Sequence, residues 1–178
     1  MEDVRELRAS ARAGREVDAF EALYLRNRTA VFSYVRSRSV SDDEAAELTA
    51  VTFERALRAY GRFRAAGGGE AAWLLRIARN AAIDDARQRS RRRDRSLDDV
   101  DVAAAGSRAQ AGANLEDDVA LRALVAALPE RQRDAVRLRY GAGLTAREIG
   151  MVIGLSEEAT QKQLERALQA LKEAYRGG

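Results

Sequence analysis

Apolar residues recur at three- and four-residue intervals along the first half of the chain, which predicts three long helices. The first is expected from about Val17 to Arg38. The second is expected to begin at Ser41, with Glu44 three residues later in the capping-box position. The third is expected from about Glu70 to Arg92, after a loop at Gly67–Gly69.

Near the C-terminus the pattern predicts two helices separated by a tight turn. Thr145 and Glu148 form a second capping-box signature, and Gly154 can adopt the left-handed conformation that ends a helix. Ser156 can then cap a second helix that we expect to reach about Tyr175. This layout is typical of a helix-turn-helix, whose second helix usually enters the major groove of DNA.

A polar segment with several glycines separates these two parts and has no sustained apolar stripe. Its charge also differs from that of its surroundings. Residues 1–95 hold 20 basic and 15 acidic side chains, a net charge of +5. Residues 96–118 hold 1 basic and 6 acidic side chains, a net charge of −5. Residues 119–178 hold 10 basic and 7 acidic side chains, a net charge of +3. The sequence therefore predicts an all-α protein with two small helical domains, at 15–95 and 116–176, joined by a flexible acidic linker at 96–115.

The composition narrows the chemistry that the chain can perform. It contains neither cysteine nor histidine, which removes disulfides, thiolate metal sites and the commonest general base and zinc ligand. An enzyme would need a carboxylate site, and no paired acids stand beside a glycine-rich pocket. No apolar run approaches the length of a membrane span, and the N-terminus has no apolar signal core. We therefore expect a cytoplasmic protein that is not an enzyme, with no catalytic residues, metal or cofactor and no membrane insertion.

Several blocks of sequence carry a family resemblance. The blocks are Phe20–Tyr24, Glu47–Ala56, Ala72–Asp84, Leu128–Arg133 and Leu138–Tyr140, followed by the helix-turn-helix. The third contains Trp-Leu-Leu-Arg-Ile-Ala-Arg-Asn, and the fourth reads Leu-Pro-Glu-Arg-Gln-Arg. Over roughly residues 16–95 and 119–174 they resemble regions 2 and 4 of the extracytoplasmic-function (group IV) sigma factors of the sigma-70 family. A helix-turn-helix alone is a weak signal, whereas the combination of these blocks in this order is specific.

The resemblance implies that the chain binds core RNA polymerase and directs it to promoter DNA. The first domain would dock on a coiled coil of the largest catalytic subunit and open the −10 element, and the second would read the −35 element. The acidic linker would lie in the RNA path of polymerase. An anti-sigma factor is the further partner that the resemblance implies.

The second predicted helix is the expected polymerase contact. The resemblance assigns this role to Glu47, Leu48, Glu54, Arg55 and Arg58. At Ala46, Ala50 and Val51 the chain departs from the family, in which polar or acidic residues are usual. The alternative interpretation of this segment is an ordinary charged surface helix.

The third predicted helix is the expected −10 contact. Arg76, Asn80, Asp84 and Arg87 follow one another at spacings of 4, 4 and 3 residues, so they share one helical face. Amide, carboxylate and guanidinium groups suit the bases and phosphates of an opened strand. Arg91 continues the set within an arginine-rich run. The alternative is a solvated polar face with intrahelical pairs such as Asp84 with Arg87. Trp73 on this helix is interpreted as a core anchor.

The recognition helix departs further from the family. The predicted −35 contacts are Arg147, Thr160, Gln161, Lys162 and Arg166. Residues 157–169 hold three acids and two bases, so this stretch is net negative where phosphate neutralisation would favour cations. We therefore expect weak reading of the −35 element. The residues interpreted as core on the same helix are Leu164, Ala167, Leu171 and Tyr175.

Two other function classes stay open at the level of sequence. The chain could be a simple DNA-binding regulator that uses only the helix-turn-helix, although this leaves the first domain unexplained. It could also be a sigma-like regulatory protein that binds polymerase or an anti-sigma factor without productive initiation.

Overall fold

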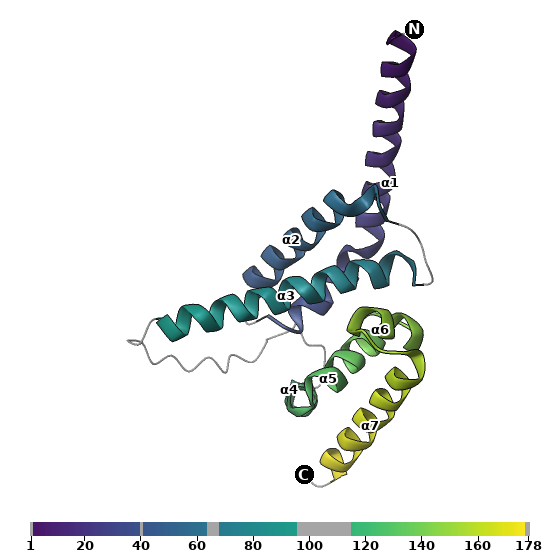
Figure 1. Ribbon diagram of the computed structural model, residues 1–178. Coiled ribbons are helices and arrows are strands. Elements are labelled where there is room, and N and C mark those ends of the chain that lie inside the picture. Colours follow the sequence, from purple (N-terminus) through teal and green to yellow (C-terminus); the bar gives the residue numbers. More distant parts are fainter. Residues whose placement is uncertain (1, 40, 64–67, 96–114, 177–178) are drawn as a thin grey trace.

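The computed structural model describes residues 2–39, 41–63, 68–95 and 115–176, and every regular element in these ranges is helical (Figure 1). The elements of the first part are α1 (Glu2–Arg36), α2 (Asp42–Tyr60) and α3 (Gly69–Arg95). Those of the second are α4 (Leu115–Ala127), α5 (Glu130–Val136), the π-helical turn η1 (Arg137–Gly141), α6 (Ala146–Ile153) and α7 (Glu157–Arg176). The predicted all-α class is confirmed. The predicted linker falls almost entirely outside the described residues.

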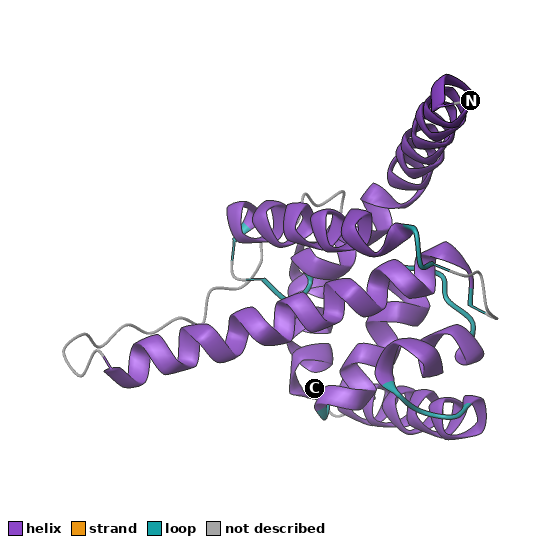
Figure 2. Cartoon of the chain, turned by 45° about the horizontal axis from the view of Figure 1, so that its top comes forward, coloured by secondary structure: helices purple, strands orange, loops and turns teal. Residues whose placement is uncertain are grey.

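Helices α1, α2 and α3 pack against one another and form the first bundle. The predicted start of α2 is confirmed, because Ser41 Oγ accepts a hydrogen bond from the backbone N–H of Glu44 at 3.1 Å. The predicted start of the first helix near Val17 is wrong, since α1 begins at Glu2. Residues 2–16 lack a strong apolar stripe but are rich in alanine, arginine and glutamate, which favour helix without tertiary contacts. This end of α1 projects away from the bundle (Figures 1 and 2).

Aromatic side chains fill one end of the first bundle. The rings of Phe20 and Tyr60 meet edge to face, with centroids 5.3 Å apart, which joins α1 to α2. Trp73 at the start of α3 packs on Phe63 with centroids 4.5 Å apart and borders the hydrophobic core. Trp73 therefore acts as a structural anchor of α3, as its position in the apolar pattern predicted.

The predicted helix-turn-helix is formed by α6 and α7. In the capping box of α6, Thr145 Oγ1 accepts from the backbone N–H of Glu148, and Glu148 Oε2 accepts from the backbone N–H of Thr145 at 2.8 Å. Gly154 ends α6 with φ +74°, a left-handed conformation that favours glycine. At Gly150 a Cβ atom would lie only 2.5 Å from the carbonyl oxygen of Leu155, so the tight turn needs glycine there as well.

Three of the four residues interpreted as core on α7 pack inward. Leu164 and Ala167 are buried, and Leu171 packs against the small cluster that contains Leu128 and Ala167. The interpretation of Tyr175 as core is wrong, because 73% of its surface is exposed. It lies one helical turn beyond Leu171, where α7 has passed the end of the elements that cover it.

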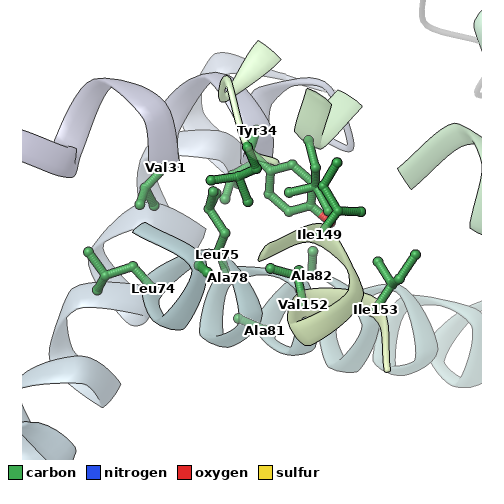
Figure 3. Close-up of a cluster of buried hydrophobic side chains, with 14 of the residues drawn as sticks. Val31, Tyr34, Leu74, Leu75, Ala78, Ala81, Ala82, Ile149, Val152 and Ile153 are labelled. Carbon is green, nitrogen blue, oxygen red and sulfur yellow. The ribbon is translucent and has the colours of Figure 1, made fainter. Parts of the chain in front are cut away.

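The two bundles share one hydrophobic core, which the sequence did not predict. Helix α6 lies directly on α3, and η1 contacts α1. Figure 3 shows Ile149, Val152 and Ile153 of α6 gathered beside Tyr34 of α1 and the small residues Ala78 and Ala82 of α3. The alanines allow α6 to approach α3 closely. The two predicted domains therefore form a single packed body in this structure.

Candidate nucleic-acid and polymerase interface

Helix α3 has one buried face and one polar face. Ala72, Leu75, Ala78 and Ala82 are buried. The predicted −10 contacts all lie on the solvent-exposed side of the helix: Arg76, Asn80, Asp84, Arg87 and Arg91. The structure therefore brings these five residues together on one exposed helical face.

Ion pairs tie part of this face to the neighbouring helix α2. Asp84 Oδ2 accepts from Arg55 Nη1 at 3.1 Å, so the predicted −10 face meets the predicted polymerase face at this pair. Arg89 lies between Glu44 at 2.5 Å and Asp85 at 2.9 Å. The arginine-rich end of α3 is therefore partly neutralised within the protein. Arg87, Arg91 and Arg92 remain exposed there.

Four of the five predicted polymerase contacts are exposed on α2: Glu47, Glu54, Arg55 and Arg58. Leu48 is the exception, with 7% of its surface exposed. It stands three residues after Ala45 and four before Thr52, both of which are buried, and so it belongs to the inward stripe of α2. The structure assigns Leu48 to packing rather than to contact with a partner. Arg58 is paired along the helix with Glu54 at 2.5 Å.

The predicted −35 contacts also include both exposed and buried side chains. Arg147, Gln161, Lys162 and Arg166 are exposed on α6 and α7. Thr160 is fully buried, and its hydroxyl donates to the carbonyl oxygen of Ser156 at 2.8 Å. It faces Gly150 across the turn, where the two helices approach most closely. Thr160 therefore cannot reach DNA in this fold, and its role is to pack the helix-turn-helix.

Two of the exposed donors of α7, Gln161 and Lys162, are engaged by acids one turn away. Lys162 Nζ lies 2.7 Å from Glu158 Oε1, and Gln161 Nε2 donates to Glu165 Oε1 at 3.3 Å. These pairs stabilise an exposed helix by a few tenths of a kcal/mol each, roughly 0.2–0.5. They also place carboxylates beside the groups that would contact DNA.

A buried charge cluster joins the two bundles, and sequence reasoning missed it. Asp134 of α5 is fully buried and accepts from Arg38, in the turn after α1, and from Arg79 Nε of α3 at 2.8 Å. Arg137 and Tyr34 complete this group, which we call the Asp134 cluster. Burial, with Arg38 nearby, lowers the pKa of Arg137 to about 10, and burial raises the pKa of Tyr34.

A signal for the buried aspartate was present in the sequence. Asp134 stands four residues before Leu138, so the two share a helical face, and Leu138 is fully buried. The signal was obscured because Asp134 follows the polar run Glu130–Arg133 and reads as part of a solvated surface. A partner from 55 residues earlier in the chain cannot be inferred from local spacing.

The fold and these faces define a class of protein. A helix-turn-helix beside a helical bundle with an exposed polar and arginine-rich face is an architecture suited to DNA. Among the described residues, no helix combines the length and the apolar character needed to cross a membrane.

Comparison with known families identifies the class more closely. The model of sigma-70 region 2 matches residues 23–92, and that of sigma-70 region 4 matches residues 124–173. The two segments come from one family, occur in the predicted order and cover most of the chain. The chain belongs to the sigma-70 family.

Individual relatives agree with this assignment. The ECF RNA polymerase sigma factor BldN of Streptomyces coelicolor is 34% identical over 168 residues, which are 93% of this chain and 63% of the relative. The ECF RNA polymerase sigma factor SigF of Caulobacter vibrioides is 39% identical over 105 residues, 59% of this chain and 56% of the relative. The chain thus spans about three fifths of the length of these two relatives. This extent of similarity supports the predicted resemblance to the extracytoplasmic-function group.

Solved structures share the fold. The sigma factor RpoE of Bartonella quintana, crystallised with the anti-sigma factor NepR, superimposes with a TM-score of 0.74 at 24% identity, covering 89% of this chain and 97% of RpoE. The structure of CnrH, solved in a complex with the cytosolic domain of CnrY, superimposes with a TM-score of 0.64 at 22% identity. The superposition covers 90% of this chain and 89% of CnrH.

Proposed function

We propose that this chain is an extracytoplasmic-function sigma factor, which binds core RNA polymerase, recognises promoter DNA and takes part in opening the −10 element. One observation carries the proposal. Segments that match regions 2 and 4 occur together in one chain, and the polar faces of α3 and of the helix-turn-helix are both exposed. The chemistry of RNA synthesis belongs to polymerase, so the chain itself acts without an active site, a metal or a cofactor. Its place of action is the cytoplasm, with polymerase.

Each exposed face is assigned one part of this function. Glu47, Glu54, Arg55 and Arg58 of α2 are the proposed contacts with polymerase. The proposed contacts with the −10 strand are Arg76, Asn80, Asp84, Arg87 and Arg91 of α3. Those with the −35 element are Arg147, Gln161, Lys162 and Arg166. Leu48 and Thr160 are left out because their side chains are buried.

An anti-sigma factor is the proposed regulatory partner. The support is the family itself: RpoE of Bartonella quintana was crystallised with the anti-sigma factor NepR. Such a partner would compete with polymerase or promoter DNA for the exposed faces of this chain.

A second candidate function is a sigma-like regulator that binds polymerase or an anti-sigma factor without starting transcription. The observation that favours it is the recognition helix, where Lys162 and Gln161 are engaged by Glu158 and Glu165. A simple helix-turn-helix regulator has less support, because it leaves the match to region 2 without a role.

Two measurements test these candidates. In native mass spectrometry with core RNA polymerase at low micromolar concentration, a one-to-one complex is expected, and its absence contradicts the proposal. Abortive transcription by that complex on a library of promoter sequences should then yield short transcripts from a subset of promoters. A complex that yields no transcript from any member would instead favour the regulator without initiation.

A further inference from the structure

Two consecutive aspartates of α3 are both bound by arginines, but in different surroundings. Asp85 belongs to a half-buried network, in which Arg89 lies 2.9 Å from Asp85 and 2.5 Å from Glu44 of α2. Asp84 lies on the exposed side of α3 and accepts from Arg55 Nη1 of α2 at 3.1 Å. The half-buried network already ties α2 to α3 by charge, so the exposed pair is not needed for that purpose.

The pair between Arg55 and Asp84 adds little to the stability of the fold. The side chains are 44% and 57% exposed, and water screens the attraction between charges at such positions. The contact between α2 and α3 rests instead on the hydrophobic core, to which Phe53 and Ala56 of α2 contribute. The pair is therefore better explained by its place on the surface than by a role in folding.

That place is the middle of the proposed −10 face. Asp84 comes four residues after Asn80 and three before Arg87, and it is the only acid among the five proposed contacts. Among the described side chains, its carboxylate is paired with Arg55 of α2 and not with Arg87 of its own helix. An acid at this point repels the phosphates of a DNA strand unless a cation offsets its charge. Arg55 supplies that cation from a neighbouring helix.

The pair leaves part of the carboxylate able to bind a base. Asp84 Oδ2 accepts from Arg55, and an ionised carboxylate has a second oxygen that can also accept hydrogen bonds. An exocyclic amino group, such as N4 of cytosine, is the base donor that carboxylates recognise. Arg55 also restricts the rotation of the Asp84 side chain, and a group that is already held in place loses less freedom when it binds.

We propose that Arg55 is a positioning residue of the −10 face, which holds the Asp84 carboxylate so that its other oxygen accepts from the amino group of a base in the opened strand. The inference rests on the proposed function, since it takes the exposed face of α3 to contact that strand. This role is additional to the polymerase contact proposed for Arg55. It predicts that the loss of Arg55 impairs promoter opening even in polymerase complexes that have fully formed.

Substitution of Arg55 tests this role at the opening step. Arg55→Met keeps much of the length of the side chain but removes its charge and its donors. At polymerase concentrations that saturate the complex, permanganate footprinting should show opening per complex reduced by about fivefold or more, the lower end of the loss expected for a base contact. Arg55→Lys keeps a cation and should retain most of the opening. Equal opening per complex by Arg55→Met and the unmodified chain would overturn the proposal.

The matched control is another exposed ion pair that joins a helix to α3. Arg26 of α1 lies 2.9 Å from Glu70 at the start of α3, and neither residue is assigned to a contact with DNA or polymerase. Arg26→Met should leave opening per complex unchanged. A loss as large as that of Arg55→Met would show that such pairs act by bracing α3, and the positioning role would fail.

A double-variant cycle tests whether Arg55 acts through Asp84. Once the carboxylate is removed by Asp84→Ala, Arg55 has no group to position, so adding Arg55→Met should reduce opening no further. Fold-losses that multiply in the double variant would show that the two residues act independently, which contradicts the proposal.

An exchange of the two charges separates positioning from simple bracing of the helices. Arg55→Asp combined with Asp84→Arg can restore an ion pair between α2 and α3, but it moves the carboxylate away from the DNA face. Opening should therefore stay impaired in the exchanged protein. Restored opening would show that the pair matters only as a link between helices.

Native mass spectrometry of the same samples distinguishes failure of this inference from failure of the proposed function. If the unmodified chain forms no complex with polymerase, or its complex opens no promoter, the proposed function is overturned and the positioning role falls with it. If the complex forms and opens promoters equally well with Arg55→Met, the proposed function stands and only the positioning role is overturned.

Discussion

Neighbouring residues of α3 face different surroundings, and this decides their roles. Ala78 and Ala82 are buried where α6 lies on the helix, whereas Asn80 and Asp84 are exposed on its other side. Small side chains on the inner face permit close packing, and functional groups on the outer face stay free of the core. A substitution on the outer face should therefore change nucleic-acid contacts without unfolding the protein.

Single substitutions on this face should impair promoter opening more than polymerase binding. We expect Arg76→Ala, Asn80→Ala and Asp84→Ala each to cost about 1–3 kcal/mol in the open complex, because each removes a group suited to a base or phosphate. Permanganate footprinting would measure the opened bases, and native mass spectrometry the complex with polymerase. Arg62→Ala is the control, since this exposed arginine lies in the turn after α2 and off the face. Footprints unchanged in all three variants would mean that the face is only a solvated surface.

Helix α7 combines a well-formed structure with an unfavourable charge for DNA. Ser156 caps it through a hydrogen bond from the backbone N–H of Ala159 at 3.2 Å, and Leu164 and Ala167 anchor its inner side. Its outer side carries Lys162 and Gln161 beside Glu158 and Glu165. DNA binding must therefore displace carboxylates that already engage the donors.

This arrangement predicts weak −35 binding with a shallow salt dependence in the full chain. Few phosphates are neutralised, so few counterions are released. Glu165→Arg should strengthen binding fairly uniformly across DNA sequences, because it removes a repulsive charge, adds a cation and frees Gln161. Gln161→Ala should instead relax specificity at one base pair, by about 1–3 kcal/mol if its contact is bidentate. Fluorescence anisotropy over a salt series measures both. Tight and steeply salt-dependent binding by the unmodified protein would contradict the assignment of these residues to the groove.

At the level of elements, local signals in the sequence predicted most of what the structure shows. Ser41, Thr145 and Gly154 mark helix ends because capping and left-handed turns depend on chemistry within a few residues. The early start of α1 was missed because residues 2–16 form a helix without an apolar stripe. The burial of Thr160 and Leu48 was not predicted, because an inward orientation follows from packing partners that a motif does not reveal.

At the scale of the whole molecule, the shared core makes the two bundles one packed body. Residues from Leu23 of α1 to Leu164 of α7 belong to one buried cluster. No local pattern predicted this, because Asp134 meets arginines that lie 96 and 55 residues away in the chain. Contacts between such distant segments are expected to couple the stability of the two bundles.

The last prediction follows from that coupling. Trp73 is the only tryptophan and lies in the first bundle, so its fluorescence reports that bundle, whereas circular dichroism reports all the helices. In urea the two signals should change together for the unmodified protein, as expected for one cooperative unit.

Asp134→Ala leaves Arg38 and Arg79 largely buried without their carboxylate, which should cost about 3 kcal/mol and separate the two transitions. Glu130→Ala is the matched control, because this exposed carboxylate lies 3.7 and 4.0 Å from the same arginines and should contribute little. Separate transitions in the unmodified protein would show that the bundles unfold independently, and equal effects of the two variants would show that burial of Asp134 has no special role.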